Sequence, residues 1–294
     1  MLKNSICPKP LHKALILAEI IGKDMDGPAR QAAQVALAST LVQSASNLHF
    51  GPEAGVKGRR QDADVVGAWS RRIHAMAADL RAAGCQDGFG MARLFRHDAR
   101  DILSDVTPGS IDAVLTSPPC PNEKDCTRTT RLEAVVLGFI ADKQDLRALR
   151  RQLVRSNTRG VHKEDIDAQR VAGNARIGAI CRAIEDRRVS LGKTSGFERM
   201  CHRVVRLHFG GMARRLASLR PALKPGATLG CVVGDRASYL QVMIRTGEIL
   251  AEPAEGLGCQ VCRLDLFRER FATATRMQMR EEVLVLRWPG GRAA

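Results

Sequence analysis

The sequence predicts an α/β fold, in which a mostly parallel, twisted sheet packs against helices. Residues 111–115 (IDAVL) form a short apolar run that is typical of a buried parallel strand, and the run ends abruptly before two prolines. A second apolar strand is predicted over 228–233, and a helix over about 243–257 follows it. Strands are also predicted over about 260–266 and 282–288. Strands that alternate with helices in this way favour right-handed strand–helix–strand units.

The N-terminal part of the chain is predicted to be helical. Residues 11–48 carry Ala, Leu, Ile and Val at helical spacing, and Gly27-Pro28 divides them into two helices. A charged, glycine-rich loop is expected over 49–64, followed by an amphipathic helix over 65–83. The apolar face of that helix consists of Val65, Trp69, Ile73, Met76 and Leu80.

Changes in texture divide the chain into four regions. A helical N-terminal region covers 1–91, and the α/β core is predicted in two parts, 92–140 and 200–294. The stretch between them, 141–199, contains 14 Lys and Arg against 8 Asp and Glu and few large apolar residues. We interpret it as a basic insertion into the core.

The overall charge indicates a polyanionic partner. Lys and Arg number 46 against 31 Asp and Glu, which gives a net charge of +15. Such an excess raises the local concentration of polyanions, with nucleic acid the first candidate, although a generally basic, arginine-rich proteome would produce the same composition. Aromatic residues make up only 4% of the chain, which argues against binding through rows of stacked rings.

Other features bear on compartment and metals. No apolar run reaches the roughly 18 residues of a membrane-spanning helix, and the N-terminus lacks a signal-peptide cleavage site, so we expect a cytoplasmic protein without a membrane partner. Nine scattered cysteines fit reduced thiols better than disulfides. Cys259 and Cys262 have the spacing of zinc ligands, but no second Cys or His pair lies near them. Two buried cysteines in a strand are the preferred interpretation, and no metal is predicted.

The chemistry of the sequence is concentrated at Thr116-Ser117-Pro118-Pro119-Cys120, where the strand over 111–115 ends. Proline fixes its own φ angle and restricts the residue before it, so two prolines hold the chain in one extended shape. Their carbonyl groups are then free to accept hydrogen bonds from a ligand. An amine that receives a methyl group needs such acceptors, which grip its N–H groups, orient its lone pair and offset the charge that develops on nitrogen. Open α/β sheets bind ligands at this edge, beyond the carboxyl ends of the strands.

This segment resembles the strand-end signature of the DNA amino-methyltransferases, which reads Ser, Asp or Asn, then Pro-Pro, then an aromatic residue. The resemblance covers roughly residues 90–290 and is interrupted over 141–199. The further matching segments are Pro121-Asn122-Glu123-Lys124-Asp125, 127–133, Leu223-Lys224-Pro225-Gly226, Val232-Val233-Gly234-Asp235 and 280–286.

The resemblance implies a three-layer α/β sandwich with the Rossmann-like sheet of the methyltransferases that use S-adenosylmethionine, whose last two strands form an antiparallel edge. It implies a site-specific DNA methyltransferase that transfers a methyl group from S-adenosylmethionine to the exocyclic N4 amine of cytosine. The Thr-Ser-Pro-Pro form is closer to the cytosine-N4 branch than to the adenine-N6 branch, which often has Asp first. The alternatives are an adenine-N6 DNA methyltransferase, an RNA methyltransferase and a catalytically dead DNA-binding remnant of the same fold.

The resemblance also assigns roles to individual residues. Ser117, Pro118 and Pro119 would hold the target amine, after the base has left the duplex. Asp98 would contact the adenine end of the cofactor, from the end of a predicted strand over 92–95 that leads into a helix over about 99–105.

Cys120 departs from the family pattern, because it occupies the position of the ring that stacks on the extruded base. Base–aromatic stacking contributes about 1–3 kcal/mol, so its loss is expected to slow turnover roughly ten- to hundredfold. Cys120 is not expected to be a nucleophile, since an exocyclic amine can attack the sulfonium directly.

The family's Phe-x-Gly-x-Gly loop, which follows the first strand and carries the methionine end of the cofactor, has no counterpart here. The candidates are Phe50-Gly51-Pro52, Gly88-Phe89-Gly90 and Phe209-Gly210-Gly211, and none follows a predicted strand. We therefore expect a sheet that is incomplete at its first strands. An upstream segment or a second polypeptide would supply the cofactor loop, and the chain alone would be impaired or dependent on it.

Arginines that follow the motif in the sequence are expected to contact DNA. Arg128 and Arg131 lie just past the motif, near the extruded base. Other arginines recur at three-to-four spacing in the basic insertion and could lie along phosphates, with a solvated helix face as the alternative. These are Arg147, Arg150, Arg151, Arg155 and Arg159.

Overall fold

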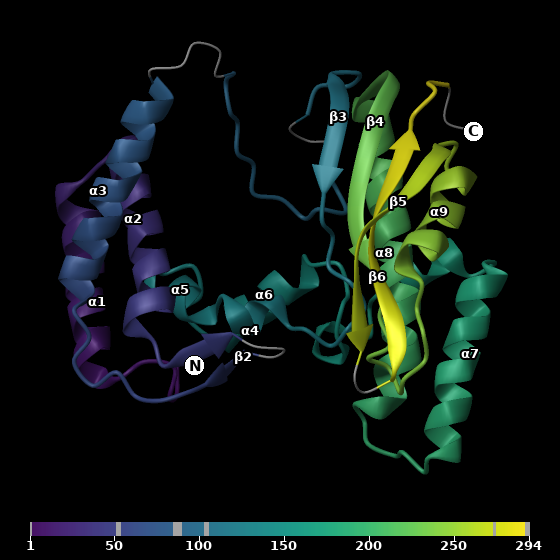
Figure 1. The fold of residues 1–294 in the computed structure, drawn as a ribbon, viewed down its shortest axis with the longest axis horizontal. Helices are drawn as coiled ribbons and strands as arrows, with labels where there is room; N and C mark the ends of the chain where they lie inside the picture. Colours follow the sequence, from purple (N-terminus) through teal and green to yellow (C-terminus); the bar gives the residue numbers. More distant parts are fainter. Residues whose placement is uncertain (1, 51–53, 85–89, 103–105, 273–274, 292–294) are drawn as a thin grey trace. The chain divides into compact units, whose positions relative to one another are not determined.

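The computed structural model describes residues 2–50, 54–84, 90–102, 106–272 and 275–291 (Figure 1). They form two compact units, each made from two stretches of the chain. Unit 1 comprises Met1–Leu94 and Cys126–Leu149, and unit 2 comprises Phe95–Asp125 and Arg150–Ala294. These boundaries differ from those of the four regions expected from the sequence.

Unit 1 is built on three helices, as predicted. Helix α1 (Pro8–Asp24) and α2 (Gly27–Thr40) each have proline in the first turn, where its missing N–H leaves no hydrogen bond unmade. The first helix is capped at Met25, and Gly27, with a φ of 54°, begins the second helix, which confirms the break at Gly27-Pro28. A π-helical turn, η1 (Leu41–Ala45), extends α2, and α3 (Val65–Gly84) is the third helix.

Shorter elements complete unit 1. Strands β1 (Leu48–Phe50) and β2 (Ala54–Val56) pair antiparallel inside the region expected to be a loop. Helices α4 (Cys126–Thr129), α5 (Arg131–Val136) and α6 (Lys143–Arg151) follow in the second stretch. The buried core of this unit includes Ile21, Leu37, Leu41, Val65 and Leu132.

The sheet of unit 2 has four strands in the order β3-β4-β6-β5 (Figure 1). Strand β3 (Ile111–Thr116) pairs parallel with β4 (Leu223–Gly234), and β4 pairs antiparallel with β6 (Met277–Arg287). Strand β5 (Gln260–Ala272) pairs antiparallel with β6 at the edge. The strands predicted over 111–115, 228–233, 260–266 and 282–288 and the antiparallel edge are thus confirmed, but the described sheet is mixed rather than mostly parallel.

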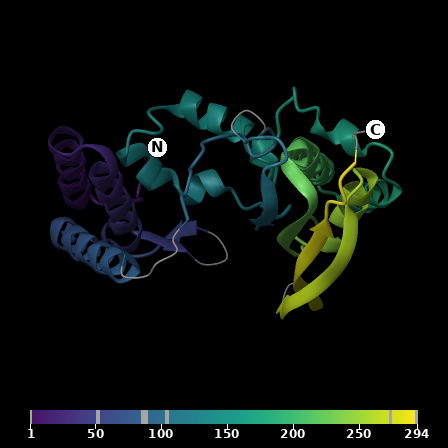
Figure 2. The same cartoon turned by 90° about the horizontal axis from the view of Figure 1, so that it is seen from above.

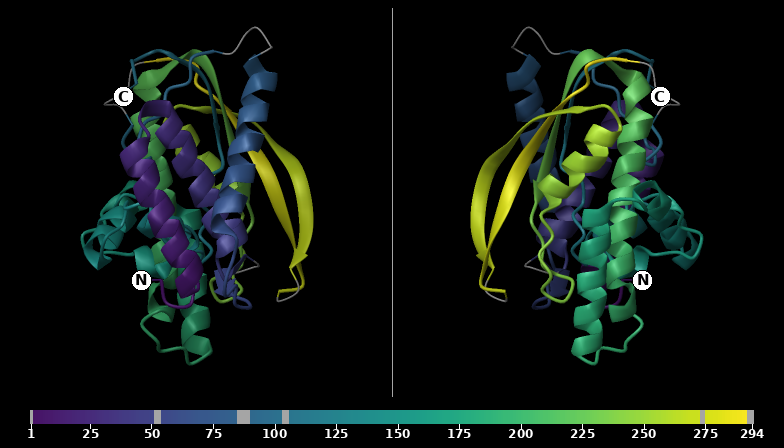
Figure 3. Two further views of the ribbon diagram at one scale, coloured as in Figure 1. Left: turned by 90° about the vertical axis from the view of Figure 1, so that its left-hand side faces the viewer. Right: turned by 90° about the vertical axis from the view of Figure 1, so that its right-hand side faces the viewer.

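Helices cover one face of this sheet (Figure 2, Figure 3). Helices α8 (Cys201–Leu219) and α9 (Thr246–Gly256) form the core with it, and α7 (Ala175–Ser190) packs outside α8. Alternate residues of β4 point into this core: Leu229, Cys231 and Val233. On the opposite face Leu115 is 83% exposed, so the described residues of unit 2 form two layers rather than three.

Two expectations about irregular regions are wrong. Residues 90–98 have no regular secondary structure, and Leu94 is fully exposed, because the apolar run over 92–95 is too short to be buried. The helix expected over 99–105 is not formed by residues 99–102, while 103–105 lie outside the described residues.

The second part of the basic segment is not a detached insertion. Apolar side chains within 150–199 are buried in the core of unit 2, beside α8: Val154, Val171, Ile177, Cys181 and Ile184. Among the described residues no helix is long and apolar enough to cross a membrane.

Candidate active site at the end of strand β3

The Ser117-Pro118-Pro119 corner follows the last residue of β3 directly and lies beside β4, as predicted. Ser117 is exposed, and its hydroxyl donates a long hydrogen bond of 3.4 Å to the carbonyl of Val232. Pro118, the next residue, is buried. No described residue donates a hydrogen bond to the carbonyls of Ser117, Pro118 or Pro119. The corner thus presents three backbone acceptors at the rim of the sheet.

The chain beyond the corner is fastened to the segment around residue 156. The amides of Asn122 and Glu123 both donate to the carbonyl of Ser156, at 3.0 and 3.1 Å. The Glu123 carboxylate accepts from the amide and hydroxyl of Thr158, at 2.9 and 3.0 Å. Glu123 also has a φ of 63°, a strained value for a residue with a side chain, which persists only where the surroundings hold it. This anchoring fixes the path of the chain on the far side of the two prolines.

Burial shapes the protonation of the groups around Glu123. Burial raises the pKa of the Glu123 carboxyl against the hydrogen bonds from Thr158. Burial and then the charge of Glu123 raise the pKa of Tyr239, whose hydroxyl donates to the Ser156 carbonyl at 2.9 Å. Burial and then Glu123 also raise the pKa of Cys201 to about 12, so its thiol stays protonated and is not a nucleophile near neutral pH.

The end of β4 is already filled by ion pairs. Asp235 is fully buried and forms an ion pair with Arg245. It also accepts from the backbone amide and Nε of Arg280, at 3.0 and 3.2 Å. Thr246 closes this end with a 2.8 Å hydrogen bond to the carbonyl of Gly234. The other carboxylate oxygen of Asp235, Oδ1, has no hydrogen-bond partner among the described residues, but Asp235 is fully buried, whereas Ser117 at the end of β3 is exposed.

One cation reaches the end of β3 from the helix layer. Arg215 of α8 donates from Nη2 to the hydroxyl of Thr116, the residue before Ser117, over 3.0 Å. Arg215 is partly buried, and no described carboxylate lies within ion-pair distance of it. Burial lowers the pKa of this guanidinium. Sequence reasoning gave Arg215 no role.

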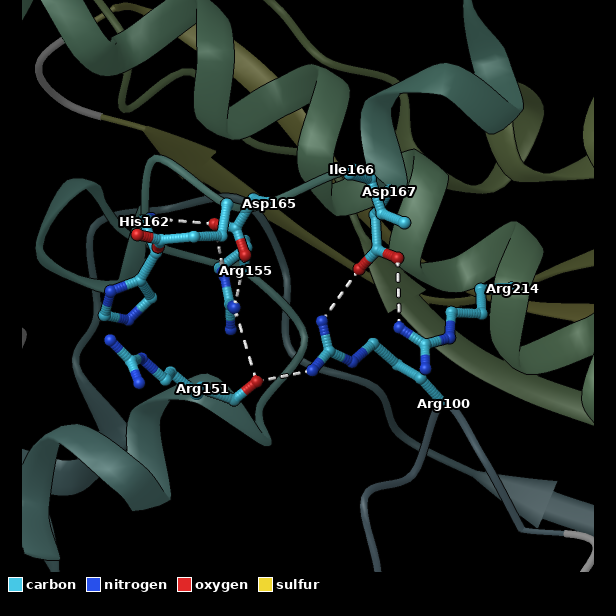
Figure 4. Close-up of a pocket in the computed structure, with 9 residues that line it drawn as sticks. Arg100, Arg151, Arg155, His162, Asp165, Ile166, Asp167 and Arg214 are labelled. Carbon is cyan, nitrogen blue, oxygen red and sulfur yellow. Dashed lines mark hydrogen bonds and ion pairs between the residues drawn. The ribbon is translucent and has the colours of Figure 1, made fainter.

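A cavity of about 380 Å³ lies on another side of α8, and it is lined by charged groups that are largely paired with one another (Figure 4). Arg100 donates to Asp167 at 2.7 Å and to Asp98 at 2.7 Å. Arg155 forms an ion pair of 2.6 Å with Asp165. The same cavity contains Arg214, which lies 3.4 Å from Asp167. Its buried arginines thus have carboxylate partners.

Asp98, expected to contact the cofactor, belongs to this cavity's ion network instead of following a strand. Its carboxylate accepts from the amide and Nε of Arg100, at 2.9 and 3.0 Å. Burial acts to raise its pKa, but the Arg100 hydrogen bonds outweigh burial and the pKa is lowered. A cofactor hydroxyl would have to compete with Arg100 for this carboxylate.

The arginines expected to bind DNA are divided between the two units. Arg128, Arg131 and Arg147 belong to unit 1, and Arg128 and Arg147 are exposed on α4 and α6. In unit 2, Arg150 pairs with Asp125 at 2.7 Å, while Arg151 is exposed and its guanidinium has no partner among the described residues. Arg155, by contrast, is buried in its ion pair, which makes it a structural residue.

The glycine-rich candidates for a cofactor loop do not form one where they are described. Gly210 lies in the middle of α8, and a Cβ there would come within 1.9 Å of the Asp167 carbonyl, so the glycine permits close packing. Gly51-Pro52 and Gly88-Phe89 lie outside the described residues. The prediction of two buried cysteines in one strand is wrong, because Cys259 is buried just before β5 and Cys262 is exposed on it.

Comparisons of the chain with protein-family models, with curated proteins and with solved structures each give no match. Within the part of the chain that the structure describes, the end of β3 combines three carbonyls without a donor, an exposed hydroxyl at Ser117 and a cation without a carboxylate at Arg215. Function is therefore inferred from this geometry and from the motif that forms it.

Proposed function

We propose that this chain is the base-binding part of an S-adenosylmethionine-dependent DNA methyltransferase that acts on the exocyclic N4 amine of cytosine. The proposal depends on one observation: the diproline corner lies at the carboxyl end of a parallel strand, with Ser117 exposed. No described residue donates a hydrogen bond to its carbonyls, so they are available to accept from the two N–H groups of an amine. The net charge of +15 favours a polyanionic substrate.

The corner can orient and prepare an amine. Two carbonyls that accept from the two N–H groups direct the nitrogen lone pair away from the chain, and their partial negative charge stabilises the positive charge that develops on nitrogen. The anchoring of Glu123 keeps these acceptors in place without rearrangement, which is the requirement for such stabilisation. The base reaches the corner only after it leaves the stacked duplex.

The described residues do not provide a cradle for the cofactor. The Asp98 carboxylate is bound by Arg100, and Gly210 of α8 is packed against the backbone at Asp167. Among the described residues β3 pairs with β4 alone, and Leu115 is exposed on the face away from the helices. We propose that a further segment or a second polypeptide carries the cofactor loop and adds a strand to this edge of β3.

Methylation assays test this proposal. The chain is incubated with cytosine-containing DNA and tritiated S-adenosylmethionine, alone and with a polypeptide carrying a Phe-x-Gly-x-Gly strand and loop. Cys120→Tyr restores a ring at the stacking position and is expected to raise turnover roughly ten- to hundredfold. Mass spectrometry of the nucleosides then distinguishes N4-methylcytosine from N6-methyladenine. If Cys120→Tyr with the added polypeptide methylates neither DNA nor RNA, the enzyme proposal is wrong.

A catalytically dead DNA-binding protein is the second candidate. Cys120 at the ring position and the occupied Asp98 carboxylate favour it, because both would weaken a catalytic site. It predicts salt-dependent DNA binding by the intact chain that is unaccompanied by methylation under every condition above.

A further inference from the structure

Arg215 differs from three other arginines of unit 2 in having no carboxylate partner among the described residues. Arg100 and Arg155 are paired with carboxylates, and so is Arg214, its neighbour on α8 (Figure 4). Arg215 has only the hydroxyl of Thr116, at 3.0 Å. Its other neighbour with a titratable group is Cys231, whose pKa is raised by burial so that it stays neutral. The guanidinium charge is therefore uncompensated by described residues.

An unpaired, partly buried guanidinium is unfavourable to the free protein. Removing a charge from water costs free energy that is recovered only when an opposite charge or good acceptors replace the water. An arginine does not escape this cost by losing its proton, because its pKa stays far above neutral. Binding of an anion beside such a group recovers this free energy, so the group favours anion binding.

Thr116 provides a second donor beside the guanidinium. Its Oγ1 accepts from Arg215, which leaves the hydroxyl hydrogen free to donate to a ligand. The guanidinium retains N–H groups that no described residue uses, and their fork matches two oxygens of one phosphate. Thr116 directly precedes Ser117, where the base would be held, and Arg215 reaches Thr116 from α8.

We propose that Arg215 and Thr116 form a phosphate subsite at the carboxyl end of β3, which binds a backbone phosphate of the nucleic-acid strand whose base enters at Ser117. The inference rests on the proposed function and adds to it the part of the substrate that positions the strand. The phosphate contact fixes the register of the strand while the corner reads the amine.

A purely structural role for Arg215 makes the opposite prediction. A long arginine side chain can cover apolar surface, and its removal then lowers stability. If Arg215 instead binds an anion, its charge is unfavourable in the free protein, and an apolar replacement of similar length removes that cost. Arg215→Met is therefore expected to leave the thermal midpoint of the intact chain unchanged or raised.

The binding experiment uses a fluorescein-labelled 20-nucleotide single strand that contains one cytosine. Arg215→Met is expected to weaken its binding about ten- to hundredfold, and to reduce the slope of log affinity against log salt by about 0.7. Arg220→Met is the matched control, because Arg220 is also partly buried but stacks on Trp288 at 4.8 Å, at the other end of the sheet. The control is expected to lose stability and keep its affinity.

Neutral methylphosphonates placed one at a time around the cytosine identify the phosphate. One substitution should weaken binding by the wild type and have no further effect on Arg215→Met. The proposal is overturned if Arg215→Met is destabilised and binds like the wild type, if no substitution is coupled to Arg215, or if the wild type does not bind the strand. It is also overturned if inorganic phosphate raises the wild-type thermal midpoint and the oligonucleotide does not.

The subsite and the proposed activity can fail separately. Coupled phosphate binding without methylation, even with the added cofactor-loop polypeptide, retains the subsite and rejects the enzyme. Methylation by Arg215→Met with an unchanged KM for DNA retains the enzyme and rejects the subsite.

Discussion

The charged cavity beside α8 and the end of β3 differ in whether their arginines have carboxylate partners. In the cavity, Arg100 and Arg155 are buried with carboxylates, and each pair leaves little for a ligand to satisfy. At the end of β3, Arg215 faces a hydroxyl, and the carbonyls of the diproline corner face no donor. Arg214 and Arg215 are adjacent in sequence, yet one belongs to each region.

This difference distinguishes charged groups that stabilise the fold by pairing with one another from groups that remain available to bind a ligand. No described residue donates to the carbonyls of the corner and Ser117 is exposed, so a ligand can bind these carbonyls without displacing an internal donor. A search for the highest density of charged side chains would have selected the cavity as the binding site, although its charges largely neutralise one another. The exposed Ser117 and a guanidinium without a carboxylate among the described residues point instead to the end of β3.

The sharpest way to break this comparison is to remove Arg100 from the cavity. Arg100→Met leaves the buried carboxylate of Asp167 and that of Asp98 without their main partner, and it is expected to lower the free energy of unfolding by about 3–5 kcal/mol. Urea unfolding followed by circular dichroism measures the loss. The exposed pair of Arg263 and Asp265 on β5 provides the control, and Arg263→Met should produce no measurable change. Equal effects of Arg100→Met and Arg215→Met would remove the distinction between the regions.

His208 gives the cavity side of α8 a pH dependence. Its ring is fully buried with Nδ1 3.0 Å from the Arg155 carbonyl, and burial lowers its pKa from 6.5 to about 4. Between these values the unfolded state binds a proton that the folded state does not. The corresponding stability is complete above pH 6.5 and is lost as the pH falls toward 4, by ~3 kcal/mol.

Comparison of the wild type with His208→Gln isolates this group from all others that titrate. The difference in free energy of unfolding between the two should shrink by ~3 kcal/mol between pH 7.5 and pH 4. Parallel pH curves for the two proteins would show that His208 is not buried in its neutral form.

Gly210 tests how tightly α8 packs on the cavity wall. A Cβ at this position would come within 1.9 Å of the Asp167 carbonyl, so Gly210→Ala forces backbone apart and is expected to cost about 1–3 kcal/mol. Gly178 in α7 is the control, since its nearest outside atom is an Arg182 side-chain nitrogen at 3.5 Å. Gly178→Ala should raise stability by about 0.5–1 kcal/mol, because alanine favours the helix. A neutral Gly210→Ala would mean that α8 is not held against this segment.

Much of the fold could be predicted because local signals coincide with the final structure. Gly27-Pro28 ends one helix and begins another, and the alternation of β4 matches its burial. The strand expected over 92–95 failed because its short apolar run had no partner strand to bury it, and Leu94 is in solvent. The mixed sheet depends on pairing between β4 and β6, which lie far apart in sequence.

The candidate site divides in the same way. Prolines that terminate a strand are a local signal, so the position of Ser117 at a strand end could be predicted. The role of Arg215 could not be predicted, since its partner Thr116 is 99 positions away and since the sequence does not show that no described carboxylate pairs with it. The ion pair of Asp98 could have been predicted from the sequence, because Arg100 is only two residues away and its side chain can reach the Asp98 carboxylate.

Ser117→Ala should have the smallest effect on stability of all these changes, and it sharpens the comparison most. The Ser117 hydroxyl is exposed and its bond to Val232 is long at 3.4 Å, so its loss should change the free energy of unfolding by less than about 0.5 kcal/mol. The corner's backbone acceptors persist, but the hydroxyl that borders the amine is removed. We expect methylation in the assay above to fall while DNA affinity and salt dependence stay those of the wild type, because the phosphate contact at Arg215 is intact. Unfolding of Ser117→Ala at lower urea would assign Ser117 to the fold, and an unchanged methylation rate would exclude its hydroxyl from the reaction.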